Sequence, residues 1–120
     1  MNGEIKVMKK AIVYCRAAST EKAEMGLSTQ ASDCLAYAQE HGYEVLEVIS
    51  EMGVGGLTLN QAGLQKLLFM CHNNEIDAVI VPDISRLARN RDLLKSLFQT
   101  FADTEVELVP LSPQPFINIW

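Results

Sequence analysis

The chain has 120 residues, of which 48% are hydrophobic and 21% are charged, and its formal net charge is −5 at pH 7. This length and composition are typical of one globular domain and exclude disordered and collagen-like classes. An acidic chain also lacks the basic excess with which a domain holds nucleic acid by bulk electrostatics, so any anion site has to be local. No stretch approaches the roughly 18 apolar residues of a membrane helix, and the sequence predicts a cytoplasmic domain without membrane contact.

The three cysteines, Cys15, Cys34 and Cys71, have no paired spacing, and each lies in an apolar run. This pattern predicts buried free thiols in a reducing compartment. His41 and His72 have no neighbours with the spacing of metal ligands, so we expect neither a metal site nor a cofactor.

The first predicted elements are a short buried strand over residues 10–15 and a helix over residues 28–42. Ser28 is the predicted N-cap of this helix, and Gly42 is the predicted stop. The helix should bury one face, formed by Ala31, Cys34, Leu35 and Ala38.

The middle of the chain predicts a second strand over residues 44–50 and a glycine-rich loop over residues 51–63. A second helix follows at about residues 61–73. Residues 76–82 form an apolar run that is typical of a central parallel strand, buried on both faces. The buried face of this second helix should consist of Leu64, Leu67, Leu68 and Cys71.

The last predicted elements are a helix capped by Asn90 and a strand over residues 106–111. The acidic residues near this strand favour an edge position in the sheet. The buried stripe of the helix should be Leu94, Leu97, Phe98 and Phe101. Strands that alternate with helices in this way predict an α/β fold, with a mostly parallel sheet of four to five strands and helices on both sides.

Polar side chains follow the first and third predicted strands. In an open parallel sheet, functional residues gather at the carboxyl ends of the strands. A planar guanidinium binds two phosphate oxygens at once, and several arginines near one point are costly without an anion between them. The pattern therefore predicts a site for a phosphate or a carboxylate. The residues concerned are Arg16, Ser19 and Thr20 after the first strand, and Asp83, Ser85, Arg86 and Arg89 after the third.

An alternative interpretation needs no ligand. Arg16 would then pair with Asp83 or Glu51, and Arg86 and Arg89 would be solvated charges at the start of a helix.

Four segments together resemble the catalytic domain of the serine recombinases, the resolvase and invertase family. They are "YCRAAST", Gln30, "EMGVGGLTLNQAGLQKLL" and "DISRLARN", and the resemblance spans residues 10–112. It implies a resolvase-like three-layer sandwich over residues 1–112, followed by a C-terminal tail over residues 113–120.

The resemblance also implies an activity, the breakage and rejoining of DNA without metal or ATP. In this family a serine hydroxyl attacks a backbone phosphodiester and forms a phosphoserine link, and subunits of a dimer or tetramer take part. The matching positions make Ser19 the candidate nucleophile. Arg16, Arg86 and Arg89 would hold the phosphate, and Tyr14 and Gln30 would support the site. DNA would be held through a C-terminal region that this chain does not contain.

Three positions depart from the family pattern. Ala18 stands where the family has its nucleophile, and Ser19 restores the pattern if one alanine is inserted. Gly55 replaces a serine of the glycine loop, and Gln61 replaces an arginine. These departures leave open a catalytically inactive domain that serves oligomerisation or regulation, and, more remotely, a binder of small anions.

Overall fold

The computed structural model describes residues 8–17, 23–52 and 61–112. Strands and helices alternate along these residues in the predicted order. The elements are β1 (Lys9–Ala17), α1 (Ala23–Glu40), β2 (Tyr43–Met52), α2 (Ala62–His72), β3 (Ala78–Val81), the 3₁₀ helix η1 (Ile84–Arg86), α3 (Arg91–Asp103) and β4 (Glu107–Pro110).

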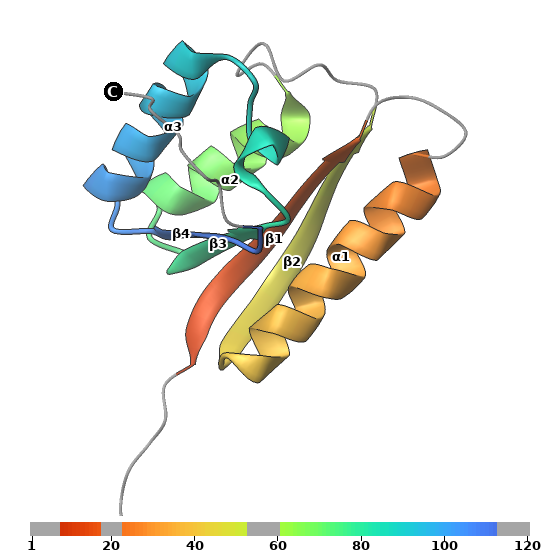
Figure 1. Ribbon diagram of the computed structural model, residues 1–120. Helices are drawn as coiled ribbons and strands as arrows, with labels where there is room; N and C mark the ends of the chain where they lie inside the picture. The colour runs from red at the N-terminus through yellow and green to blue at the C-terminus, as the bar shows by residue number, and fades with distance from the viewer. Residues whose placement is uncertain (1–7, 18–22, 53–60, 113–120) are drawn as a thin grey trace, which may run out of the picture.

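The four described strands form one parallel sheet in the order β2-β1-β3-β4. Helix α1 lies on one side of the sheet, and α2 and α3 lie on the other (Figure 1). This arrangement confirms the predicted α/β fold, with helices on both sides of a parallel sheet. It also confirms the edge position of β4 and places β1 beside β3, so that the ends of these two strands are neighbours.

Two hydrophobic cores flank the sheet, and β1 contributes to both because its side chains alternate between the two faces. Ile12 and Tyr14 belong to the core under α2 and α3. Ala11, Val13 and Cys15 belong to the core under α1. A strand buried on both faces holds its carboxyl end firmly, and that end carries Arg16.

Helix α1 begins at Ala23, five positions before the predicted start, so the prediction of Ser28 as N-cap is wrong. The apolar stripe from Ala31 onward predicted a helix there but did not show how far the helix extends before it. Leu35 is 41% exposed, although the pattern placed it on the buried face. Cys34 and Ala38 of that face are buried, and Gly42 has the left-handed backbone of a helix stop, with φ of 77°.

Strand β1 runs past the predicted end at residue 15 and includes Arg16, which pairs with Glu51 of β2 in the sheet register. Strand β2 likewise extends to Met52. Strand β3 is shorter than the apolar run that predicted it, because Ile76 precedes the strand yet is buried in the core. In residues 76–82, apolar character therefore indicated which residues are buried. The ends of β3 depend instead on which of these residues pair with the neighbouring strands.

All three cysteines are free and buried, as predicted. In the described part of the chain no helix is long and apolar enough to cross a membrane.

Asn90 is the N-cap of α3, as predicted. Its side-chain oxygen accepts hydrogen bonds from the backbone N–H groups of Asp92 at 2.8 Å and Leu93 at 3.1 Å. The buried stripe of α3 is narrower than predicted: Leu97 and Phe101 are buried, while Leu94 and Phe98 are partly buried.

Replacing Asn90 by alanine is expected to lower the free energy of unfolding by about 1 kcal/mol, because two backbone donors lose their acceptor. Urea unfolding followed by circular dichroism measures this change. Asn90→Asp keeps an acceptor and adds a favourable charge at the helix start, so its stability should remain close to that of the wild type. Equal losses in both variants would show that the cap does not stabilise α3.

Candidate active site

The guanidinium of Arg16 lies at the carboxyl end of β1 and is buried, with the residue only 3% exposed. Its Nε donates a hydrogen bond to the backbone carbonyl of Arg86 at 3.0 Å, and its Nη2 donates to the carbonyl of Ser85. In return, Nη1 of Arg86 donates to the carbonyl of Arg16 at 3.1 Å. These reciprocal bonds tie β1 to the segment after β3.

Asp83 organises the segment that carries Arg86. Its Oδ1 accepts a hydrogen bond from the backbone N–H of Ser85 at 3.0 Å and another from the Ser85 hydroxyl. Asp83 is thus the N-cap of η1. Its Oδ2 lies 3.4 Å from Nε of Arg86. Among the ion pairs between described residues, Asp83 therefore pairs with Arg86, and not with Arg16 as the ligand-free alternative supposed. Leu87 and Ala88 are buried directly after η1 and anchor it to the core.

The three candidate arginines share one region of the molecule. Burial lowers the pKa of the Arg16 guanidinium, and the positive charge of Arg89 lowers it further, as does that of Arg86. Arginine nevertheless stays charged, because its ordinary pKa lies far above neutral pH. Like charges held together in this way repel each other, and an anion between them would relieve that repulsion.

A buried carboxylate, Glu51, lies at the end of β2, in sheet register with Arg16 of β1. It accepts hydrogen bonds from the hydroxyl of Tyr14 and from the backbone N–H groups of Gly63 and Leu64, both at 3.0 Å. It also raises the pKa of Arg16, although more weakly than burial and Arg89 lower it. Because Gly63 and Leu64 lie in the first turn of α2, Glu51 joins the end of β2 to the start of α2 across residues 53–60.

The close approach of Glu51 to α2 requires glycine at position 63. A Cβ added there would lie 2.6 Å from Cγ2 of Ile49 and 2.7 Å from Cδ of Glu51. Both distances are shorter than side chains tolerate, so a larger residue would displace the carboxylate.

Tyr14 titrates far from its usual range. Burial raises the pKa of its hydroxyl, and the hydrogen bond to Glu51 raises it further. The folded protein thus keeps Tyr14 neutral at a pH at which the unfolded chain loses that proton. A raised folded-state pKa contributes stability below the unfolded value of about 10, and this contribution is lost as the pH rises further.

The free energy of unfolding should therefore fall above about pH 10, with Tyr14 contributing about 1.4 kcal/mol per pH unit. Urea unfolding between pH 9 and 11 measures this slope. Tyr14→Phe should show a shallower slope, because it removes one titrating group. Parallel slopes in the two proteins would contradict the buried, neutral hydroxyl.

Gln30 and Gln61 approach the candidate site from different elements. The side-chain amide of Gln30, on α1, donates weakly to the carbonyl of Arg16 at 3.5 Å, and its Oε1 is buried without a hydrogen-bond partner among the described residues. Gln61 is 4% exposed, and its Oε1 lies 3.5 Å from the hydroxyl of Tyr14. Both glutamines thus lie close to β1 residues of the candidate site.

The structure thus brings five of the six predicted site residues together: Arg16, Arg86, Arg89, Tyr14 and Gln30. The sixth, Ser19, lies outside the described residues, as do Ala18, Thr20 and Gly55. Its distance to the arginines therefore stays a prediction.

Two residues are more important to the geometry than the sequence indicated. Glu51 appeared there only as a possible partner of Arg16, and Asp83 appeared as one of the polar residues after the third strand and as a possible partner of Arg16. Glu51 is the last residue but one of β2, and Asp83 comes two residues after the end of β3. An acidic residue near a strand end, next to a predicted arginine cluster, is the signal that could have found them. The described residues contain no group of three or more His, Cys, Asp or Glu side chains that could hold a metal ion.

Comparison with known proteins gives a family and a fold. Residues 11–118 match the model of the resolvase N-terminal domain family. The catalytic domain of ISC1926 TnpA, an IS607-like serine recombinase, is 25% identical, with a TM-score of 0.79 over 88% of this chain and 71% of that one. The N-terminal catalytic domain of TP901-1 integrase is 28% identical, with a TM-score of 0.77 over 86% and 78% of the two chains.

A serine recombinase from Sulfolobus solfataricus is 27% identical, with a TM-score of 0.70 over 94% of this chain and 74% of that one. These structures agree with the parallel sheet and the helical layers described above. Since the family model covers nearly the whole chain and the neighbouring structures are recombinase catalytic domains, this protein belongs to the resolvase family and has the fold of a serine recombinase catalytic domain.

Proposed function

We propose that this domain breaks and rejoins DNA strands through a covalent phosphoserine intermediate, with Ser19 as the nucleophile. The observation that carries the proposal is the reciprocal bonding of Arg16 and Arg86, with Arg89 close by. Three guanidiniums from two chain segments gather where a serine follows β1 in the sequence. Family membership supports the same activity.

The chemistry balances without a cofactor. The Oγ of Ser19 forms a bond to phosphorus, the bond from phosphorus to the 3′ oxygen breaks, and the serine proton ends on the free 3′ hydroxyl. Negative charge develops on the non-bridging phosphate oxygens during this displacement. Fixed guanidiniums stabilise that charge more in the transition state than in the ground state, which accelerates the reaction.

The acidic chain contributes little to holding DNA. Affinity for duplex DNA depends mainly on Lys and Arg contacts to phosphates, and a domain with a net charge of −5 opposes the approach of a polyanion. We therefore propose that another part of the parent protein holds the DNA, and that copies of this domain assemble on it in the cytoplasm. The local arginine cluster then acts on one phosphodiester.

A denaturant-resistant adduct between protein and DNA tests the function. The parent protein is mixed with a pool of duplex DNA that has a random central sequence, and covalently attached DNA is selected and amplified. We expect an adduct with the wild-type sequence and none with Ser19→Ala, because the hydroxyl that forms the bond is gone. An adduct of equal yield in Ser19→Ala would overturn Ser19 as the nucleophile, and its absence in the wild type would overturn the activity.

A further inference from the structure

Two cysteine thiols meet between β1 and α1, outside the chemistry proposed above. Cys15 lies on β1 and Cys34 on α1, and both residues are 0% exposed. They belong to the same hydrophobic core, on the side of the sheet that α1 covers (Figure 1). Their side chains share a hydrogen bond. The two sulfur atoms are therefore near neighbours, which is the first geometric requirement for a disulfide.

Packing alone does not require two thiols at this place. Alanine fills neighbouring positions of the same core at Ala11, Ala38 and Ala78. A thiol is a weak donor and a weak acceptor, so the hydrogen bond between two thiols contributes little to stability. Redox chemistry is what distinguishes this pair from two further small apolar side chains.

The two thiols are not equivalent. The hydrogen bond from Cys34 lowers the pKa of the Cys15 thiol, burial opposes this shift, and the positive charge of Arg86 lowers the pKa further. The same hydrogen bond and burial raise the pKa of Cys34. Cys15 is thus the sulfur that ionises first, and Cys34 keeps a proton to donate. The thiolate is the form of cysteine that reacts with peroxides.

Cys71 is an internal standard for this pair. It is equally buried, but it lies on α2, in the core on the other side of the sheet. Burial raises the pKa of its thiol to about 11, although a hydrogen bond with Thr104 opposes the shift. Cys71 therefore combines the same burial with a protonated thiol and no neighbouring cysteine.

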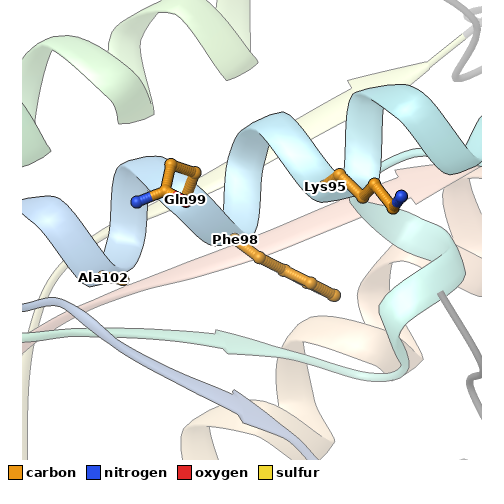
Figure 2. A pocket seen from close by; sticks show the side chains of 4 residues that line it. All are labelled: Lys95, Phe98, Gln99 and Ala102. Atoms are coloured by element: carbon orange, nitrogen blue, oxygen red, sulfur yellow. The ribbon is translucent and has the colours of Figure 1, made fainter. Parts of the chain in front are cut away.

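Burial limits which reagents reach the pair. The hollow of about 400 Å³ along α3 lies on the opposite side of the sheet and does not reach these thiols. Figure 2 shows the residues that line it, Lys95, Phe98, Gln99 and Ala102. A bulky or charged reagent would require the core under α1 to open. A small, uncharged oxidant requires the least opening, and hydrogen peroxide is such an oxidant.

We propose that Cys15 and Cys34 are a modification site for peroxides, at which oxidation forms a disulfide between β1 and α1. The Cys15 thiolate attacks one peroxide oxygen, the O–O bond breaks, and the leaving hydroxide takes up a proton. Cys15 is then a sulfenic acid. The Cys34 sulfur attacks the Cys15 sulfur, the S–O bond breaks, and water leaves with the Cys34 proton. In total two thiols lose two electrons and two protons, and one peroxide becomes two waters.

The disulfide would lie next to the candidate active site. Cys15 directly precedes Arg16, and Cys34 is one turn of α1 away from Gln30, whose amide donates to the carbonyl of Arg16. Oxidation would therefore fix α1 covalently against the strand that carries Arg16. Disulfides of cytosolic proteins are usually transient and redox-sensing, and a reversible link of this kind belongs to that class.

Mapping the oxidised thiols tests the proposal. The native protein is freed of reductant and treated with hydrogen peroxide, catalase stops the reaction, and the remaining thiols are alkylated in denaturant. Trypsin then separates the cysteines into peptides 11–16, 23–66 and 67–86. We expect the first two peptides to be linked until dithiothreitol is added, and Cys71 to be alkylated. Cys15 should be lost at least about tenfold faster than Cys71, because it has the larger thiolate fraction.

A matched pair of variants tests the role of Cys34. In Cys34→Ser the second step is impossible, so Cys15 should stop at the sulfenic acid, which dimedone traps. Cys71→Ser replaces an equally buried helical cysteine and should form the link at the wild-type rate. Circular dichroism shows whether both variants fold, and the mapping in the wild type decides the proposal without them.

Three results with the wild-type protein would overturn the proposal. The first is a protein that keeps Cys15 and Cys34 alkylatable after peroxide treatment. The second is loss of Cys15 and Cys71 at equal rates, because the pair would then confer no reactivity. The third is a link between Cys15 and Cys34 that forms only after urea has unfolded the chain.

Discussion

Replacing Arg16 by glutamine is expected to reduce the rate of covalent adduct formation about 10³-fold, because transition-state charge on a phosphodiester loses a fixed, buried cation. The structure supplies a second reason. Arg16 holds the carbonyl groups of Ser85 and Arg86, so its loss also releases the segment that positions Arg86. Single-turnover assays with a DNA ligand from the adduct selection measure the rate.

Arg91→Ala is the matched control for this prediction. Arg91 is exposed at the start of α3, carries the same charge and contributes equally to the net charge of the domain. If bulk charge sets the rate, the two variants should slow the reaction equally. If the buried cluster sets it, Arg91→Ala should change the rate by less than a factor of about 3, which corresponds to about 0.6 kcal/mol. Equal rates in Arg16→Gln and the wild type would exclude Arg16 from the reaction.

Replacing Glu51 by alanine is expected to lower the free energy of unfolding by about 3 kcal/mol or more. Three donors lose their acceptor: the Tyr14 hydroxyl and the N–H groups of Gly63 and Leu64. Each buried donor without a partner costs about 1–3 kcal/mol. Urea unfolding measures the loss at neutral pH.

Glu47→Ala is the control on the same strand. Glu47 pairs with Nζ of Lys66 at 2.6 Å, and both side chains are substantially exposed. A pair of this kind contributes about 0–1 kcal/mol. Equal losses for the two variants would show that Glu51 acts only as a surface charge, and would contradict its part in joining β2 to α2.

The order of elements and the neighbouring position of β1 and β3 could be predicted from the sequence, because periodicity and the rules of parallel sheets depend on local patterns. The start of α1 could not, since Ser28 has the residue type of a cap but lies within the helix. Cap residues also occur inside helices, and helix propensity before the apolar stripe gives only a weak signal.

The candidate site was predictable as a set of residues, and its bonding pattern was not. Arginines after two neighbouring parallel strands must meet at one edge, which is why Arg16 and Arg86 could be placed together. The partner of each charge depends on side-chain rotamers and on the path of η1. Asp83 pairs with Arg86 in the folded chain, and Arg16 bonds to backbone carbonyls, which no sequence pattern specifies.

The most direct test is to map the residue that carries the DNA. The adduct is digested with protease and nuclease, and mass spectrometry locates the phosphodiester-linked nucleotide within the peptide that contains Ser19 and Thr20. The nucleotide is expected on Ser19 alone, and Thr20→Ala should leave its yield unchanged. A nucleotide attached to Thr20, or to a residue of another segment, would contradict a phosphodiester cleaved beside Arg16 and Arg86 by Ser19.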